Sequence, residues 1–221
     1  MIKRKNILKI AIDSPAAAGA GTIAKAISKN YNLFHLDTGK IYRLIALYKI
    51  KFPKKSNINF LKKKINNLKV KDLKKRELLS DKVGTIASTI AKKKNIRKIV
   101  YNFQKNLAYN PPKKYSGSCL DGRDITYNII PDADVKLFLT ASLKTRAKRR
   151  FKELKKLNHK VNFKQVYDSI KERDNHDFFR KVSPLKKTKD SIKIDSTDLS
   201  INSCFDKINK IIKRVLSIKY K

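Results

Sequence analysis

The strongest constraint on the fold of this chain lies in residues 7–22, where an apolar run, a turn of small residues and a helix follow one another. The run from Ile7 to Ile12 is typical of a short buried strand. Small residues fill the turn from Ser14 to Gly21, and we expect a helix to begin at Thr22. A strand, a small-residue turn and a helix N-terminus together point backbone N–H groups at a phosphate. The segment therefore predicts a phosphate-binding loop.

This loop lacks the lysine of the common pattern G-x-x-x-x-G-K-[ST]. Ser14 holds the first Gly position and Gly19 holds the second. Ala20 stands at the Lys position, and Gly21 stands at the hydroxyl position with Thr22 one residue later. The missing side chain is the one that normally reaches the transferred phosphate. Taken alone, the loop is equally compatible with a plain turn between a strand and a helix.

The charge of the chain is extreme for its size. Its 221 residues include 55 Lys and Arg against 18 Asp and Glu, a formal net charge of +37. Such a field attracts polyanions, including nucleotides, RNA and anionic lipid. A biased composition, with lysines scattered over solvated faces, accounts for the same numbers. We expect non-specific polyanion binding at low salt in either case.

Several classes of protein are disfavoured by what the sequence lacks. No stretch approaches the roughly 20 apolar residues of a membrane span, and the basic N-terminus runs into the first strand without a signal-peptide core. Only two cysteines occur, and the three histidines are dispersed, so we expect no His/Cys metal site and no disulfide framework. We expect a single domain over residues 1–221, a monomer, and a reducing cytoplasmic location. The two cysteines are Cys119 and Cys204, and the three histidines are His35, His159 and His176.

Apolar runs and helical periodicities alternate along the chain. Strands are predicted at Ile7–Ile12, Leu33–Leu36, Ser118–Leu120, Val135–Leu139 and Ile192–Ile194. Helical patterns cover Thr22–Asn30, Lys40–Ile50, Val83–Leu107, Leu143–Leu157, Phe163–Glu172 and Ile201–Leu216. This alternation predicts an α/β fold in which helices cover both faces of a parallel sheet. The Lys/Asn-rich segment Lys51–Asp81 is interpreted as a helical insertion, and Asn175–Lys189 as a mobile loop.

Polar motifs follow the second and third predicted strands. The first is L36-D-T-G-K-I-Y-R43, and the second is D121-G-R-D-I125. Ligands of parallel α/β folds bind at the carboxyl ends of the strands, which is where both motifs lie. In the first motif, Thr38 can donate to a phosphate or a base and Arg43 can bind a phosphate in bidentate fashion. The alternative is a helix cap made by Asp37 or Thr38. In the second motif, Arg123 is either a nucleotide contact or part of an ion-pair knot with Asp121 and Asp124.

Two further basic segments carry candidate site residues. In R173-D-N-H-D-F-F-R180, the side chains of Arg173, Asp177 and Arg180 share one face if the segment is helical. The alternative for this segment is a surface salt-bridge ladder. Arg146, Arg149 and Arg150 lie on the helix after the fourth strand, where the alternative is a solvated face.

Taken in order, these segments resemble bacterial cytidylate kinase, a family of nucleoside monophosphate kinases, over nearly the whole chain outside Lys51–Asp81. The order and spacing of many short segments make the resemblance specific. They are I-A-I-D-x-P-A-A-x-G, L-D-T-G-x-x-Y-R, Ala87-Ser88, Ile96-Arg97, Phe103-Gln104, Pro111-Pro112, L-D-G-R-D-I from Leu120, P-D-A-D-V-K-L-F-L-T-A-S from Pro131, R-A-K-R-R from Arg146, I-K-E-R-D from Ile170, Asp177 with Arg180, Pro184-Leu185, and I-D-S-T from Ile194.

The resemblance implies a three-layer P-loop fold with a five-stranded parallel sheet, a monophosphate-binding insertion over residues 51–82 and a lid over roughly residues 146–184. It implies transfer of the γ-phosphoryl group of ATP, bound with Mg²⁺, to CMP or dCMP in pyrimidine nucleotide metabolism. The ATP-binding residues would be Ser14, Pro15, Ala16, Ala17, Ala18, Gly19, Ala20, Gly21 and Thr22. The CMP-binding residues would be Asp37, Thr38, Arg43, Ser88, Arg97, Arg123, Asp124, Arg173, Asp177 and Arg180. The catalytic residues would be Arg149, Arg150 and Arg173.

The chain departs from the family at three places. The family has Gly at position 14 and Lys at position 20, and its arginine just before the Ser88 helix is replaced near Leu79; the insertion is also lysine-rich and short. Loss of one donor to the developing charge typically costs about 3–4 kcal/mol of transition-state stabilisation. We therefore expect a surrogate cation in a working kinase, with Lys25, Lys186 and Lys187 as candidates.

Three other readings compete with a cytidylate kinase. One is a catalytically dead nucleotide-binding module, since Ala20 removes the phosphate lysine. Another is a basic RNA-binding protein on the same fold, although no interleaved aromatic platform of the kind that stacks bases is present. The third is a kinase for a different nucleoside monophosphate.

Overall fold

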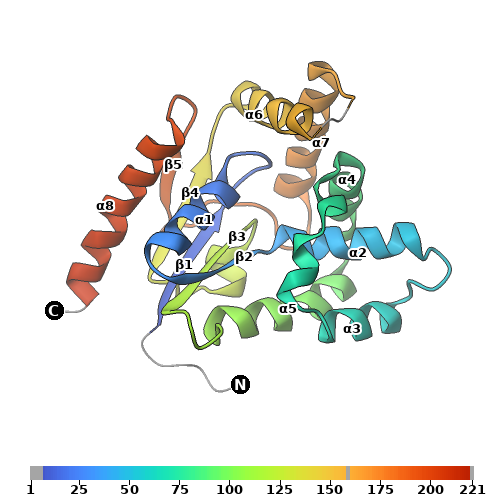
Figure 1. Ribbon diagram of the computed structural model, residues 1–221, viewed down its shortest axis with the longest axis horizontal. Coiled ribbons are helices and arrows are strands. Elements are labelled where there is room, and N and C mark those ends of the chain that lie inside the picture. Colours follow the sequence, from blue (N-terminus) through green and yellow to red (C-terminus); the bar gives the residue numbers. More distant parts are fainter. Residues whose placement is uncertain (1–6, 158–159, 220–221) are drawn as a thin grey trace.

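A computed structural model of the chain describes residues 7–157 and 160–219, so the basic N-terminus and His159 lie outside the described residues. Five strands form one sheet in the order β2-β3-β1-β4-β5, and every pair is parallel (Figure 1). Their bounds are β1 Leu8–Asp13, β2 Leu33–Asp37, β3 Gly117–Gly122, β4 Val135–Thr140 and β5 Ile192–Asp195. The predicted five-stranded parallel sheet is confirmed, and each strand begins or ends within two residues of its predicted bounds.

Helices pack on both faces of the sheet because the strands alternate their apolar side chains. In β1, Ile10 and Ile12 face a core shared with α1 (Ala20–Asn30) and α8 (Ile201–Lys219). Ala11, between them, faces the opposite core, which is built with α2 (Gly39–Lys51) and α5 (Lys94–Tyr109). A period of two along a strand sends successive side chains to opposite faces. This gives the three-layer arrangement visible in Figure 1.

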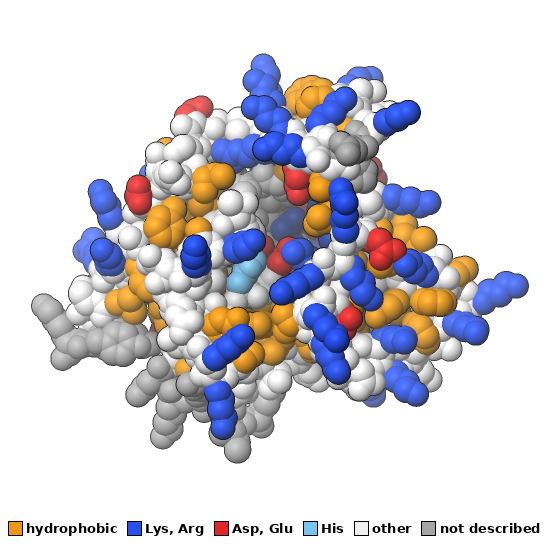
Figure 2. Space-filling model, in the orientation of Figure 1, with side chains coloured by type: hydrophobic (Ala, Val, Ile, Leu, Met, Phe, Trp, Pro, Cys, Tyr) orange, Lys and Arg blue, Asp and Glu red, His pale blue; other side chains and the backbone are white. Residues whose placement is uncertain are grey.

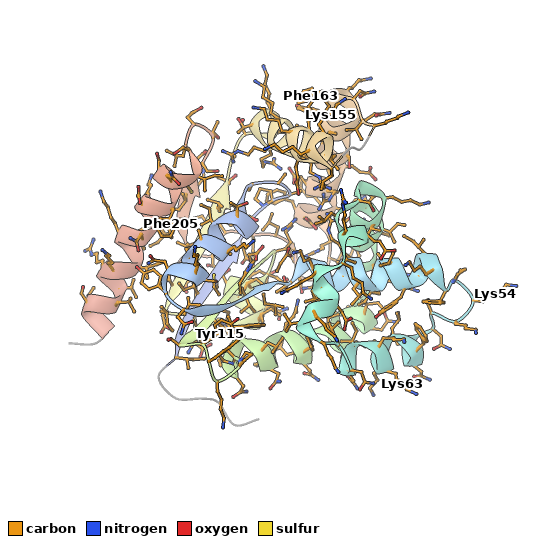
Figure 3. The ribbon with its side chains drawn as sticks, viewed as in Figure 1. Lys54, Lys63, Tyr115, Lys155, Phe163 and Phe205 are labelled. Atoms are coloured by element: carbon orange, nitrogen blue, oxygen red, sulfur yellow. The ribbon has the colours of Figure 1, made fainter. Side chains whose placement is uncertain are left out.

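The predicted insertion Lys51–Asp81 is helical, as expected. It contains α3 (Ile58–Asn66) and two short 3-10 turns, Val70–Lys74 and Arg76–Leu79. Most of its leucines and isoleucines are buried against the core, among them Leu61, Ile65 and Leu78, while Ile58 is exposed. Its lysines project into solvent, as Figure 3 shows for Lys54 and Lys63.

The predicted helical stretch Val83–Leu107 is two helices, α4 (Asp81–Ile90) and α5, separated by a break at residues 91–93. The sequence has no Gly or Pro at this break. The pattern therefore gave no signal that one helix ends and another begins there. The break allows Arg97 Nη1 to donate to the Ala91 carbonyl oxygen at 3.3 Å.

Helices α6 (Leu143–Lys156) and α7 (Phe163–Phe179) pack together beyond the carboxyl ends of the strands (Figure 1). They enclose a small apolar core with Ala16 of the phosphate loop. The predicted helix Phe163–Glu172 was too short, and the expected mobile loop Asn175–Lys189 is helical as far as Phe179. The alternative of a surface salt-bridge ladder for this segment is wrong, because Asp177 and Arg180 are buried.

No helix within the described residues is long and apolar enough to cross a membrane. Both cysteines are buried and free. Basic side chains are distributed over all parts of the face in Figure 2, and others line a hollow near its centre.

Candidate functional site

The phosphate loop connects β1 to α1, and its backbone is fixed at both ends. Ser14 N donates to the Gly122 carbonyl oxygen at 3.1 Å. Ala17 (φ 58°) and Gly19 (φ 92°) adopt the left-handed conformation, which costs an alanine about 1–2 kcal/mol. Helix α1 begins at Ala20, two residues before the predicted start, so the N–H groups after Gly19 are those a helix leaves without internal partners. The loop therefore has the backbone of an anion site.

Helices α6 and α7 clamp this loop from outside. Arg146 Nη1 donates to the Ala16 carbonyl oxygen at 2.9 Å, and its Nη2 lies 2.6 Å from Asp174 Oδ2. Asp174 Oδ1 accepts from the Ala16 N–H at 3.3 Å. Arg149 Nη2 donates to the Ser196 carbonyl oxygen at 2.5 Å. The alternative of a solvated face for the arginines of α6 is wrong, because Arg146 and Arg150 are buried.

A cavity of about 220 Å³, hereafter the phosphate cavity, lies against the loop. Eight of the nine predicted ATP-binding residues line it, and Ala16 is buried behind them. Five cationic side chains and three carboxylates complete the wall. The cations are Lys40, Arg43, Arg123, Arg150 and Arg173, and the carboxylates are Asp37, Asp121 and Glu153.

Arg173 is the least compensated of these cations. Its Nε is buried and finds no hydrogen-bond partner among the described residues. Burial, together with the nearby guanidinium groups of Arg43 and Arg123, lowers the pKa of Arg173 well below its ordinary value. Like charges held together without water favour the binding of an anion. The end of α7 therefore contributes an unmatched positive charge to the phosphate cavity.

A second cavity, hereafter the acceptor cavity, lies beside the first. Arg43, Arg123 and Arg173 line both cavities, so the two meet at these three side chains. The acceptor cavity brings together nine of the ten predicted CMP-binding residues; the tenth, Asp37, lines the phosphate cavity instead. These nine are Thr38, Arg43, Ser88, Arg97, Arg123, Asp124, Arg173, Asp177 and Arg180.

Buried ion pairs order the wall of the acceptor cavity. Arg97 is paired with Asp124 through a direct hydrogen bond. Arg123 Nε lies 2.6 Å from Asp177 Oδ2, and Arg180 Nη1 lies 3.3 Å from Asp177 Oδ1. Burial alone would raise the pKa of Asp177, but Arg123 and Arg180 outweigh it and hold that pKa below its usual range. The alternative in which Arg123 forms ion pairs with Asp121 and Asp124 is therefore wrong, because Arg123 is paired with Asp177 of α7.

In the motif after β2, Asp37 supplies the helix cap, while Thr38 and Arg43 line the acceptor cavity. Asp37 Oδ1 accepts from the Lys40 N–H at 3.3 Å, so Asp37 caps α2. Thr38 Oγ1 donates to the Asp121 carbonyl oxygen at 2.8 Å and ties β2 to β3. Arg43 Nη1 donates to the Leu78 carbonyl oxygen at 2.5 Å, which joins α2 to the insertion.

Three polar residues of the site were not predicted. Asp13 at the end of β1 is buried and accepts from Ile125 N at 2.7 Å and from Thr126 N at 3.0 Å, which fixes the turn after β3. Asp174 holds the phosphate loop, and His176 Nδ1 lies 3.4 Å from Ser88 Oγ. Asp13 could have been predicted, because it lies at the carboxyl end of a strand, where site residues of parallel sheets gather. The other two follow from helix packing, which periodicity does not reveal.

Comparison with known proteins gives a consistent picture. A family model described as cytidylate kinase matches residues 10–214. A cytidylate kinase of Bartonella tribocorum is 40% identical over 202 residues, covering 89% of this chain and 90% of that protein. A cytidylate kinase of Clostridium tetani is 40% identical over 218 residues, with 94% of both chains covered. One of Mesomycoplasma hyopneumoniae is 36% identical over 223 residues, again with 94% of both chains covered.

Among solved structures, an uncharacterized protein from Eubacterium ventriosum has the same fold, with a TM-score of 0.51 and 19% sequence identity. The match covers 93% of this chain and 98% of that one.

Proposed function

Because the chain belongs to the cytidylate kinase family and is thus a phosphotransferase, we propose that it transfers the terminal phosphoryl group of Mg-ATP to CMP or dCMP, giving CDP or dCDP. In this reaction the bond between the γ-phosphorus and the β,γ-bridging oxygen breaks, and its electron pair stays on ADP. A new bond forms between the γ-phosphorus and a phosphate oxygen of the acceptor.

One observation carries the proposal: the phosphate and acceptor cavities meet at Arg43, Arg123 and Arg173. Phosphoryl transfer needs two phosphates held in line and a cationic environment for the charge that develops between them. The unmatched charge of Arg173 suits that junction. We assign the catalytic role to Arg173 together with Arg149 and Arg150 of α6.

On the donor side, we assign the phosphates of ATP to the backbone of Ser14–Thr22. A third cavity, of about 650 Å³, lies on the other side of this loop, between α1, α6 and the start of α8. Arg149, Leu199 and Ile201 are among its lining residues, and their mixed apolar and cationic surface suits an adenosine group. ATP would then lie across the loop with its terminal phosphate in the phosphate cavity.

The Mg²⁺ would arrive with ATP. Within the described residues no group of three His, Cys, Asp or Glu side chains could hold a metal by itself. Mg²⁺ is commonly held by one or two carboxylates together with substrate phosphates. The hydroxyl of Thr22 and the carboxylates of Asp37 and Asp121 line the phosphate cavity and offer such oxygens. The ion would neutralise charge on the phosphates.

On the acceptor side, we propose that the arginines hold the phosphate of CMP while Ser88 and Asp177 contact its base or sugar. Ser88 Oγ donates to the Thr85 carbonyl oxygen at 2.8 Å, which leaves its lone pairs to accept a hydrogen bond. Asp177 stays ionised between two arginines and can accept hydrogen bonds from amino or hydroxyl groups.

We further propose that residues 51–82 act as the monophosphate-binding insertion and residues 146–184 as the lid of a single domain. The bond from Arg150 Nη2 to the Leu79 carbonyl oxygen, at 2.6 Å, links the two segments across the phosphate cavity. We expect a monomer. The two buried free thiols are compatible with a reducing cytoplasm.

Calorimetric titration of CMP tests the acceptor assignment. We expect Arg180→Ala to weaken CMP binding by about tenfold or more, since it removes a buried charge-assisted contact. Lys181→Ala, which removes an exposed charge next to it, serves as the matched control and should have little effect. Equal, small effects of both changes would mean that the acceptor binds elsewhere.

The alternative considered from the sequence is a nucleotide-binding module that performs no transfer, since Ala20 stands at the lysine position; the match to the cytidylate kinase family does not favour it. Such a protein would bind ATP and CMP but release no ADP in the presence of both. The ADP-release assay distinguishes the two.

A further inference from the structure

The family lysine missing at position 20 has a candidate replacement in the phosphate cavity. None of Lys25, Lys186 and Lys187, the surrogates considered from the sequence, is among the described residues that line this cavity. Lys25 is exposed on α1. Lys186 Nζ lies 4.5 Å from the centre of the Tyr127 ring, and Lys187 Nζ donates to the Thr188 carbonyl oxygen.

Lys40 is the one lysine among the described residues that line the phosphate cavity, where Ala20, Gly21 and Thr22 are also lining residues. It lies in the first turn of α2, directly after the motif that ends β2. Its side chain is 33% exposed, so its ammonium group is accessible to a ligand in the cavity without being fully solvated. The phosphate loop and Lys40 thus face one space from two different elements.

The contacts of Lys40 leave its ammonium group available to a phosphate. Nζ lies 3.7 Å from Asp37 Oδ2, within ion-pair range but beyond a hydrogen bond. A lysine in the first turn of a helix is also opposed by the helix dipole. Both features favour a move of Nζ from Asp37 toward an incoming anion. The four flexible methylene groups of the side chain allow this movement.

Three of the four arginines of the cavity are held by contacts within the protein, and the fourth, Arg173, also lines the acceptor cavity. Arg43 is hydrogen-bonded to the Leu78 carbonyl oxygen, and Arg150 to the Leu79 carbonyl oxygen. Arg123 is paired with Asp177, and both Arg123 and Arg173 also line the acceptor cavity. A planar guanidinium held in such contacts does not follow a phosphoryl group as it moves, whereas an ammonium on a flexible stem does.

We propose that Lys40 supplies the phosphate-binding charge that Ala20 cannot, by placing its ammonium group on the β- and γ-phosphates of ATP. This inference rests on the proposed kinase function. Lys40 stays protonated throughout: it donates hydrogen bonds to the phosphate oxygens, and no proton leaves it. Asp37 Oδ2, released from the Lys40 ammonium group, would then be available to the Mg²⁺ that accompanies ATP, while Oδ1 keeps its bond to the Lys40 N–H.

The test is a set of variants with two readouts, the turnover number with CMP and the binding of Mg-ATP without acceptor. Lys40→Met keeps the stem and removes the charge, and we expect it to lower kcat about 10²- to 10³-fold, the scale of one transition-state donor. It should also weaken Mg-ATP binding, while the KM for CMP changes little. Lys25→Met on α1 is the matched control and should leave both readouts unchanged.

The most decisive variants restore the lysine that the family has at position 20. Ala20→Lys combined with Lys40→Met should return kcat to within about tenfold of the native value, because one cation replaces the other. Ala20→Lys alone should give little gain, since the site is already occupied by Lys40.

The inference would be overturned by a Lys40→Met variant whose kcat and Mg-ATP affinity both stay within about threefold of native. It would equally be overturned by a loss that Ala20→Lys does not repair, since the role of Lys40 would then be to support Asp37 and α2. If the native protein released no ADP at all, the proposed function would fail, and the binding readout would still decide the role of Lys40.

Discussion

The arginines of the site differ in what neutralises them, and this difference separates structural from functional residues. Arg146 is paired with Asp174 and bonded to two carbonyl oxygens, so it is satisfied without a ligand. Arg173 has a buried Nε without a partner and stands among other arginines. A buried charge left uncompensated destabilises the free protein and is compensated when an anion binds.

Arg173 should therefore show opposite effects on stability and activity. Arg173→Met keeps most of the buried stem and removes the charge, so the free energy of unfolding of the ligand-free protein should be unchanged or higher. The rate of CMP phosphorylation should fall about 10²-fold or more. Chemical denaturation and steady-state kinetics measure the two quantities. A large loss of stability would show that Arg173 is a structural residue.

Asp177 should give the protein a distinct sensitivity to acid. Its pKa is held below the ordinary value of 3.8, so its ionised form stabilises the folded state above that pH. This contribution is lost as the pH falls below about 4 and through the lower folded-state pKa. Asp177→Asn cannot titrate, so its unfolding free energy should fall less steeply between pH 5 and 3. Parallel pH profiles for the native and variant proteins would contradict the assignment.

At the scale of elements, close approach between helices α2 and α4 positions the acceptor site. A Cβ added at Gly84 of α4 would lie 2.7 Å from Arg43 Nη2 of α2, closer than two unbonded atoms can sit. Because that atom is the end of a flexible side chain, the guanidinium can move aside, at the cost of its hydrogen bond to the Leu78 carbonyl oxygen. The absence of a side chain at Gly84 thus leaves room for Arg43 in the acceptor cavity.

Gly84→Ala should consequently damage binding rather than folding. Alanine is better than glycine in a helix by about 1 kcal/mol, which offsets the crowding. We expect a KM for CMP raised about tenfold, with an unchanged or higher melting temperature. Thr89→Ala, on an exposed position of the same helix, is the control for helix propensity. An unchanged KM would show that Arg43 does not hold the acceptor.

The sequence predicted elements better than it predicted contacts. The run Ile7–Ile12 and its four counterparts are visible because the strands of a parallel sheet covered on both faces are rich in apolar residues. The break at residues 91–93 carries no Gly or Pro, and the last turn of α7 exposes Phe178 and Phe179 while it buries Asp177, so the sequence signals neither the break nor this turn. The pairing of Arg123 with Asp177 joins residues 54 positions apart, and only the packing of α7 over the sheet determines it. The resemblance to a family supplied the nine residues of the acceptor cavity, which periodicity alone could not bring together.

For the whole molecule, the dominant property is its net charge of +37. Lysines such as Lys54, Lys63 and Lys155 project outward from different elements (Figure 3), and the Lys and Arg side chains on the face in Figure 2 are dispersed over it. Dispersed charge releases counterions from a polyanion without reading bases. The field would also raise the local concentration of anionic nucleotides around the site.

Binding to RNA should therefore be non-specific and steeply dependent on salt. We expect affinity for heparin and for unrelated RNA sequences to fall by about 10³-fold or more between 50 and 200 mM salt. Fluorescence anisotropy over a salt series measures this. Tight, sequence-dependent binding that persists at high salt would instead support an RNA-binding function for the fold.

The central claim is that this chain is a working kinase for cytidine monophosphates although its phosphate loop has lost the lysine. Coupled measurement of ADP release with CMP, dCMP, UMP and AMP as acceptors tests it most directly. We predict turnover with CMP or dCMP, at a kcat/KM at least about tenfold above that for UMP and AMP, the scale of one hydrogen bond that only cytosine completes. Equal or faster phosphorylation of AMP or UMP, or no release of ADP with any acceptor, would contradict the account.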